Sequence, residues 1–312
     1  MWLLTAILFA IIYAIISVIS YSLGIGNFYF YLILSIVMML IQYMLGPKLI
    51  EWSMRVRYLK EGEDPELQSM IRSLATAANI PAPRIGIAAV AVPNAFAFGR
   101  SIKDGRICVT EGIVGLLDRD ELKAVLGHEM SHIKNRDVLT ITLLSVIPII
   151  LYRIAWQFLF FGGRRDRQSN AALVGLAALI FYFVTNLLVL YGSRVREYFA
   201  DKGSVDLGNK PSKLASALYK LVLGSARMPK EAIKDVEGMK AFFANDPSRA
   251  LYELRELKDI DIDRSGTISD SELANLRNKT MRLGFGDKLM ELLSTHPNML
   301  KRIKRLSEWG RV

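Results

Sequence analysis

Long apolar stretches alternate with soluble-type segments along the chain. Residues 1–46 contain no Asp, Glu, Lys or Arg, and residues 171–192 contain none either. A third apolar segment, residues 138–161, is interrupted by Arg153. A membrane-spanning helix needs roughly 20 mostly apolar residues, and the turn-forming Gly-Ile-Gly-Asn at 24–27 divides the first stretch into two helices. The pattern therefore predicts four apolar membrane helices.

The segments between these helices have the periodicities of a soluble α+β domain. Residues 64–79 begin with Asp-Pro-Glu, a capping residue followed by proline at the first helical position, and are expected to form a helix. A strand is expected at 84–90 and a hairpin at 102–110, giving a small antiparallel sheet. A capped amphipathic helix begins at Asp118, and we expect it to continue unbroken into the third apolar segment. Residues 193–312 are expected to be mostly helical.

The net charge of +10 is spread along the chain rather than gathered in one basic block. A nucleic-acid-binding protein would more often show a basic stripe with interleaved aromatic residues, so no nucleic acid is expected as a partner. Lys48, Arg55 and Arg57 follow the first two apolar helices, which indicates the cytoplasmic face under the positive-inside rule. The single cysteine, Cys108, excludes an internal disulfide framework and agrees with a reducing compartment.

Arginines between the third and fourth apolar segments conflict with this simple topology. Arg164, Arg165 and Arg167 lie in a loop that should be outside, and Arg153 interrupts the third segment. Two interpretations remain open, because these segments either cross the bilayer or form a shallow hairpin that does not fully cross. Both interpretations leave the soluble segments on the cytoplasmic side.

One short motif carries the candidate chemistry. His128-Glu129-Met130-Ser131-His132 places two imidazoles at positions i and i+4, on one face of a helix. This is the H-E-x-x-H pattern of zinc hydrolases, in which the histidines bind the ion and the glutamate takes a proton from water. The chain has only three histidines, so a chance match is rare. We predict one zinc ion at His128 and His132, with Glu129 as the general base.

A catalytic zinc site needs a third protein ligand and an open fourth position. Glu197 is the predicted third ligand, and Asp201, one turn later, is placed to accept the second N–H of a zinc-bound imidazole. Taken alone, a solvated helix face among arginines would be the favoured interpretation of both carboxylates. The spacing favours the site, because His132 lies six residues before residue 138 and Glu197 six residues after residue 191. Both are therefore roughly 9 Å from the membrane boundary.

With these motifs in order, the sequence resembles the HtpX-type membrane metalloproteases. The resemblance covers nearly the whole chain and rests on His128-Glu129-x-x-His132, Arg196-Glu197-x-x-Ala200-Asp201, Thr295-His296-Pro297 followed by Arg302, and Pro-Asn-Ala-Phe-Ala-Phe-Gly at 93–99. It implies a gluzincin endopeptidase that helps to degrade damaged or misassembled membrane proteins. It also implies that His296 stabilises the oxyanion and that Asn94 and Arg302 bind substrate. From the residues alone, His296-Pro297 would stop a helix and Arg302 would belong to a basic helix.

Residues 261–272 fit a second metal motif, the 12-residue EF-hand loop. Gly266 occupies position 6 of the motif and Ile268 position 8, and helix-like segments flank the loop. The candidate calcium ligands are Asp261, Asp263, Ser265, Thr267 and Glu272. EF-hands usually work in pairs and calcium loops are not part of the resembled family's pattern, so a solvated acidic turn is the favoured interpretation.

The sequence thus predicts a mainly α protein in which a four-helix membrane anchor carries a zincin-like α+β catalytic domain. Its expected parts are a transmembrane hairpin (1–46), the first part of the catalytic domain (47–137), the third and fourth transmembrane segments (138–192) and the second part of the catalytic domain (193–312). We expect zinc-dependent hydrolysis of peptide bonds in misfolded or membrane proteins, at the cytoplasmic side of the cell membrane. Protein substrates and the lipid bilayer are the expected partners.

Two other functions remain open. A CaaX prenyl protease shares the zinc pattern, although it is built with more spans than the four predicted here. A catalytically silent membrane scaffold with a calcium-responsive loop is the other alternative, although zinc binding alone would not require Glu129. Zinc content and cleavage of casein would separate these hypotheses.

Overall fold

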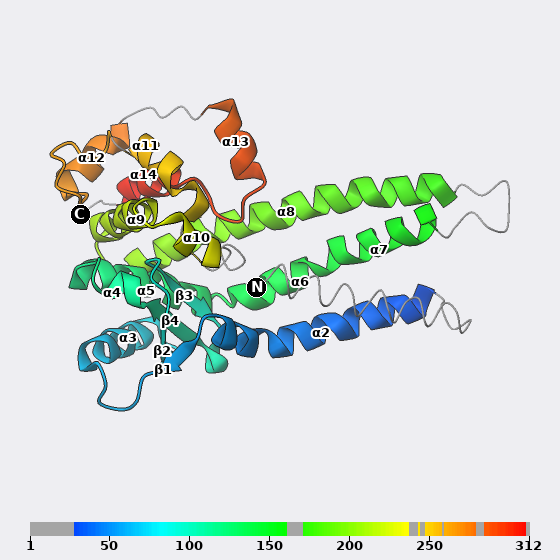
Figure 1. The fold of residues 1–312 in the computed structure, drawn as a ribbon, viewed down its shortest axis with the longest axis horizontal. Helices are drawn as coiled ribbons and strands as arrows, with labels where there is room; N and C mark the ends of the chain where they lie inside the picture. Colours follow the sequence, from blue (N-terminus) through cyan, green and yellow to red (C-terminus); the bar gives the residue numbers. More distant parts are fainter. Residues whose placement is uncertain are drawn as a thin grey trace. The chain divides into compact units, whose positions relative to one another are not determined.

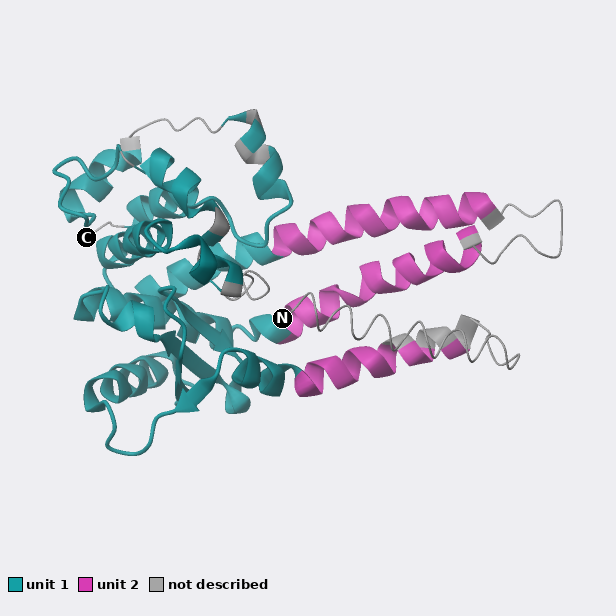
Figure 2. Ribbon diagram, in the orientation of Figure 1, with its two compact units in different colours: residues 1, 46–138, 193–312 teal, residues 2–45, 139–192 magenta. Residues whose placement is uncertain are grey.

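The computed structural model describes residues 28–160, 171–236, 243, 247–257, 259–278 and 284–309 (Figure 1). The chain divides into two compact units (Figure 2). One unit contains residues 1, 46–138 and 193–312, and the other contains residues 2–45 and 139–192. The first predicted membrane helix and the arginine-containing loop at 164–167 lie outside the described residues.

Long apolar helices make up the described part of the second unit. They are α2 (Phe28–Ser53), α6 (Asp137–Leu144), α7 (Val146–Phe160) and the greater part of α8 (Ala171–Asp206). In the described part of the chain, two segments are long and apolar enough to cross a membrane, 137–159 and 172–206. A break at Ser145 separates α6 from α7, close to Pro148, which cannot donate a backbone hydrogen bond. These two candidate spans support a membrane anchor, but the four-helix anchor is not confirmed.

The helix that carries the H-E-x-x-H motif is α5 (Arg119–Lys134). It begins with a complete capping box, in which Asp118 and Glu121 each accept the other's backbone N–H at 2.8 Å. It ends before the apolar segment, so the prediction of one unbroken helix is wrong. Arg136 adopts a left-handed backbone conformation with φ 54°, which redirects the chain before α6 starts. No Gly or Pro marks this stop in the sequence.

The sheet is small and mixed, which corrects the prediction of an antiparallel one. Its spatial order is β1 (Val56–Tyr58), β2 (Arg84–Ala88), β4 (Arg106–Thr110) and β3 (Ala95–Phe98). β2 and β4 are parallel, because the chain between them forms β3 on the far side of β4. The hairpin predicted at 102–110 is a 3₁₀ turn, Ile102–Asp104, followed by β4. As a result β3 is an edge strand.

Helices surround α5 and bury it in the main hydrophobic core. The core joins residues such as Leu126 and Met130 of α5 with Leu218 of α9 and Ile303 of α14. In addition, α5 packs against α3 and β3. The remaining helices are α3 (Pro65–Ala78), α4 (Glu111–Val114), α9 (Pro211–Ala226), α10 (Lys230–Val236), α11 (Ala250–Leu257), α12 (Asp270–Asn278), α13 (Phe285–Leu292) and α14 (Met299–Trp309). The predicted mainly helical class is confirmed, and its central helix carries the motif.

Candidate active site

Small residues bring α5 and the last turns of α8 into close contact. A Cβ atom at Gly203 would lie 2.2 Å from Ser131 Oγ, and one at Gly127 would lie 2.4 Å from Asn209 Nδ2. Glycine at both positions therefore permits an approach that a larger residue would prevent. Ser204 Oγ also donates a 2.6 Å hydrogen bond to the carbonyl of Ala124 on α5. This contact brings the acidic face of α8 up to the histidines of α5.

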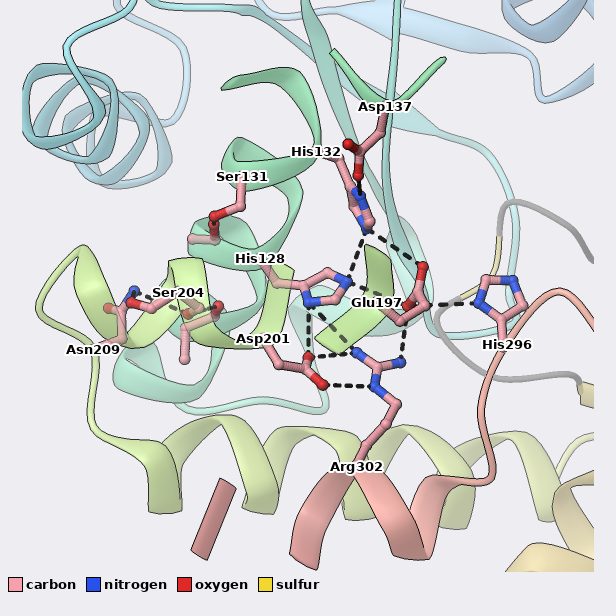
Figure 3. Close-up of polar contacts among 12 residues, drawn as sticks. His128, Ser131, His132, Asp137, Glu197, Asp201, Ser204, Asn209, His296 and Arg302 are labelled. Atoms are coloured by element: carbon pink, nitrogen blue, oxygen red, sulfur yellow. Dashed lines mark hydrogen bonds and ion pairs between the residues drawn. The ribbon is translucent and has the colours of Figure 1, made fainter. Parts of the chain in front are cut away.

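The side chains of His128, His132 and Glu197 converge on one point (Figure 3). The Nε2 atoms of the two histidines are 3.1 Å apart, and the carboxylate oxygens of Glu197 lie 3.5 and 3.6 Å from them. Tetrahedral ligands at zinc bond lengths of about 2.0–2.1 Å are themselves about 3.3–3.4 Å apart. The three side chains thus fit a zinc ion and would leave its fourth position open.

Each histidine is oriented by its own carboxylate. His128 Nδ1–H donates to Asp201 Oδ1 at 2.9 Å, and His132 Nδ1–H donates to Asp137 Oδ2 at 2.5 Å. Both Nε2 atoms are therefore directed to the shared point. Arg196 forms an ion pair with Asp137 in turn. The sequence analysis does not predict Asp137. A signal was present, because each of two metal-binding imidazoles needs a carboxylate to accept its second N–H and Asp201 supplies only one.

Arg302 lies beneath this arrangement and has no exposed surface. Its guanidinium binds Asp201 in a bidentate manner, at 2.9 and 2.6 Å, and approaches Glu197 Oε2 at 3.2 Å. Bidentate pairs of this kind fix both position and charge. In this structure Arg302 holds the two carboxylates of α8 in place.

The buried charges of the site shift one another's titration. Burial raises the pKa of Glu197, but the charges of His296 and Arg302 outweigh it and hold the pKa well below its ordinary value. The pKa of Asp201 is also lowered, since Arg302 and the hydrogen bond from His128 outweigh burial. Burial lowers the pKa of His128, but Asp201 and Glu197 outweigh it and raise the pKa to about 10. Such surroundings favour a positive charge at His128, whether a proton or a metal ion.

Glu129 differs from these two carboxylates, because burial dominates its titration. Its pKa is raised by burial, against smaller lowering effects from His128, His132 and a backbone hydrogen bond of Ala97. A carboxylate with a raised pKa is closer to the range in which a general base works near neutral pH. Ala97 belongs to β3, so the edge strand passes directly beside Glu129.

His296 faces the same site from the loop between α13 and α14 (Figure 3). Its Nδ1 lies 3.5 Å from Glu197 Oε2. Neither ring nitrogen has a hydrogen-bond partner among the described residues, although both are buried. The ring can therefore donate a hydrogen bond to a bound molecule.

Asn94 lies directly before the edge strand β3. It is fully buried at the start of β3, where its backbone N–H donates to Thr110 Oγ1 at 2.8 Å. Its carbonyl accepts from the backbone N–H of Thr110 at 2.9 Å. These contacts anchor the beginning of the edge strand to β4.

The EF-hand-like loop brings its acidic side chains together between α11 and α12. Carboxylate oxygens of Asp261, Asp263 and Glu272 all lie within 4.8 Å of one another. Gly266 has a positive φ of 78°, as the sharp turn at position 6 requires. Backbone N–H groups of the loop donate to Asp261 and Glu272, and Tyr219 on α9 donates to Asp261 at 3.2 Å.

Comparison of the sequence with known proteins identifies its family. The family model described as peptidase family M48 matches residues 61–310. A protease HtpX homolog of Methanothermobacter thermautotrophicus is 52% identical over 223 residues, which cover 72% of this chain and 84% of the relative. A protease HtpX homolog of Thermococcus sibiricus is 39% identical over 316 residues, covering 98% of this chain and 95% of the relative.

A solved structure shares the fold at low sequence identity. The crystal structure of S. mikatae Ste24p aligns with a TM-score of 0.55 and 14% identity, covering 98% of this chain and 66% of that one. The family match spans α5, the end of α8 and α14, the helices that supply the converging side chains. The chain therefore belongs to peptidase family M48 and is a membrane metalloprotease of the HtpX type.

Proposed function

We propose that the chain is a zinc endopeptidase that cleaves protein substrates close to the membrane surface. The observation that carries this proposal is the spacing of the two Nε2 atoms and the Glu197 carboxylate, at 3.1 to 3.6 Å. Zinc bound there would supply a Lewis acid that polarises the scissile carbonyl and lowers the pKa of the attacking water. Glu129 would take the proton from that water and pass it to the leaving amine.

The remaining polar side chains divide the supporting roles. His296 would donate a hydrogen bond to the oxyanion, which suits its unbonded ring nitrogens in the described part of the chain. Asp201 and Asp137 would keep the histidines in the tautomer that presents Nε2. Arg302 would hold Asp201 and Glu197 in place rather than bind substrate, because its guanidinium is buried against both.

The edge strand β3 is the proposed place for the substrate backbone. An extended peptide can add to an exposed sheet edge through main-chain hydrogen bonds. Such a peptide would run past Glu129, because the backbone of Ala97 contacts that carboxylate. The main chain of Asn94 would fix the start of β3 against Thr110, and its side chain keeps the predicted role of binding the substrate backbone.

The proposed substrates are misfolded or membrane proteins on the cytoplasmic side. Support comes from the sequence, since His132 and Glu197 each lie six residues from an apolar segment. Two candidate spans in the described chain agree with membrane attachment. A protease held at this level reaches chains that lie in or emerge from the bilayer, which is where a quality-control protease would act.

Zinc content of ligand variants tests this function. Glu197→Ala should lower bound zinc from one equivalent per chain toward zero and abolish cleavage of casein, because it removes one of three protein ligands. Asp206→Ala, which removes an exposed carboxylate nine residues further along α8, is the matched control and should keep one zinc. Full zinc content in Glu197→Ala would show that another residue is the third ligand.

The alternatives make different predictions in the same assays. A CaaX prenyl protease would cleave prenylated peptides and leave casein intact. A silent scaffold would bind zinc and cleave neither substrate. The burial of Glu129 beside both histidines favours an active enzyme over the scaffold.

We also propose calcium as an ion for the loop at 261–272. Asp261 and Glu272 are both buried, and in the described part of the chain no Lys or Arg forms an ion pair with them. Calcium at about 1 mM should therefore raise the Tm of the purified protein, and Asp261→Ala with Glu272→Ala should remove the increase. An unchanged Tm with calcium would leave the loop as an ordinary acidic turn.

A further inference from the structure

Over residues 289–293, at the carboxyl end of helix α13 and directly after it, the apolar side chains are exposed and a carboxylate is buried. Leu289, Met290, Leu292 and Leu293 are 50, 44, 41 and 65% exposed, whereas Glu291 among them is 8% exposed. A helix on the surface of a soluble protein normally turns its apolar face to the core and its charges to water. A contiguous exposed apolar patch of this kind usually marks a surface that is covered in the working protein.

Specific contacts of Glu291 hold α13 in this orientation. Glu291 forms an ion pair with Lys301 of α14, and it also accepts the backbone N–H of Asn298 at 3.3 Å. A rotation of α13 that buried its leucines would break this pair and leave the buried carboxylate of Glu291 without a partner, which is costly. The apolar side of α13 therefore remains outward.

Arg194 joins the carboxyl end of α13 to α8. Its guanidinium donates to the carbonyls of Glu291, Leu292 and Ser294 at 2.9, 3.0 and 2.7 Å, at the carboxyl end of α13. Arg194 stands two residues beyond the charge-free run 171–192. At 1.5 Å per residue that is about 3 Å along α8. The carboxyl end of α13 thus lies next to the point where α8 leaves its apolar segment.

We propose that α13 is an interfacial helix whose Leu289, Met290, Leu292 and Leu293 insert into the boundary between lipid headgroups and acyl chains. Helices that lie in a membrane surface bury one apolar face to this shallow depth. The arginine at the same level would remain among protein carbonyls, as a charge next to hydrocarbon requires. The inserted helix would hold the loop that carries His296 at the bilayer surface.

Lipid is favoured over a protein partner because Arg194, which binds the carboxyl end of α13, stands two residues after the charge-free run of a candidate membrane span. A second copy of the chain or an apolar segment of a substrate would instead cover the patch with protein. The proposal depends on membrane attachment and not on peptide-bond hydrolysis.

An environment-sensitive fluorophore at single cysteines tests the insertion. Leu289→Cys and Leu293→Cys, each with Cys108→Ser and the inactive Glu129→Gln, are labelled and reconstituted into vesicles of phosphatidylcholine and phosphatidylglycerol. The control is Leu251→Cys on α11, which is 64% exposed in the same unit. Lipids spin-labelled near the headgroup should quench positions 289 and 293 at least twofold more than 251, and aqueous iodide should quench them at least twofold less.

Two outcomes would overturn the proposal. Quenching by iodide at 289 and 293 equal to that at 251 would mean that the patch faces water. Protection from iodide without quenching by lipid would mean that protein covers it, and dependence on the protein-to-lipid ratio would then identify a second copy.

A second measurement needs no substitution on α13. A photoreactive phosphatidylcholine with its carbene source near the headgroup should label the wild-type peptide containing 289–293 and leave the peptide containing 250–257 unlabelled. Equal labelling of both peptides, or of neither, would contradict the insertion. Loss of proteolysis in any of these preparations has no bearing on the result.

Discussion

Asp137 is the residue that most changes the account of the site. It lies outside the H-E-x-x-H motif, yet it accepts the Nδ1–H of His132 and pairs with Arg196. The left-handed backbone of Arg136 returns it to the end of α5. A spacing rule applied to a continuous helix would instead have carried it away from the zinc ligands, so the sequence pattern could not reveal it.

Asp137→Asn should weaken zinc binding without unfolding the protein. The amide can no longer stabilise the imidazole tautomer through its negative charge, and changes of this kind typically reduce metal affinity about 10–100-fold. The dissociation constant for zinc, measured by competition with a fluorescent chelator, checks this. Asp206→Asn is the control, since Asp206 pairs only with Lys202 on the exposed side of α8 among the described contacts. An unchanged zinc affinity in Asp137→Asn would show that Asp137 does not orient His132.

At the level of the elements, the contact of α5 with α8 determines whether the ligands meet. A Cβ atom at Gly203 of α8 would meet Ser131 Oγ of α5 at 2.2 Å, and one at Gly127 of α5 would meet Ser204 Oγ of α8 at 2.9 Å. The meeting of the metal ligands therefore depends on small residues that take no part in metal binding or catalysis. Glycines inside a helical pattern gave no sign of this role in the sequence, because the partner helix is separated by more than 60 residues.

Gly203→Ala should separate the two helices slightly and lower both stability and zinc occupancy. The added methyl meets the Cβ of Ser131 at 2.7 Å, and overpacking of this kind costs about 1–3 kcal/mol. Thermal unfolding and zinc content measure the two effects. Gly115→Ala is the matched control, because its new methyl meets nothing within 4 Å and its φ is −88°. If the two variants behave alike, the close approach has no bearing on the site.

Local signals and long-range pairings differed in how well they could be predicted. The capping box at Asp118 and Glu121 and the mainly helical class follow from residues close in sequence. The parallel pairing of β2 with β4 does not, because it depends on β3 returning along the far side of β4. The antiparallel sheet predicted at 84–110 was wrong for this reason. Burial of Arg302 likewise depends on long-range packing, because α14 packs against α9 and α12 and the guanidinium reaches Asp201 on α8.

At the scale of the whole molecule, the two parts of the first unit must lie in one compartment. The unit joins residues 46–138 with 193–312, on either side of the third and fourth apolar segments. Its ligands come from both parts, His128 and His132 from the first and Glu197 from the second. A pair of segments that returns the chain to the same side satisfies this requirement, whether they cross fully or form a shallow hairpin.

Cysteine labelling in intact cells tests this topology. With Cys108→Ser as background, Ser101→Cys and Ser271→Cys lie at exposed positions in the two parts and should react only with reagents that enter the cytoplasm. Ser169→Cys, in the loop between the apolar segments, should react from outside if those segments cross. Labelling of Ser169→Cys from the cytoplasm alone would indicate the shallow hairpin. Labelling of positions 101 and 271 from opposite faces would contradict the zinc site.

Different side chains of the H-E-x-x-H motif are proposed to bind zinc and to transfer the proton. Glu129→Gln removes the base and leaves His128, His132 and Glu197 intact, so metal content and activity should separate. Zinc per chain and casein cleavage are measured on the same reconstituted sample. We expect one zinc per chain, as in the wild type, with cleavage reduced by at least 100-fold. Cleavage at the wild-type rate with zinc still bound would contradict this assignment.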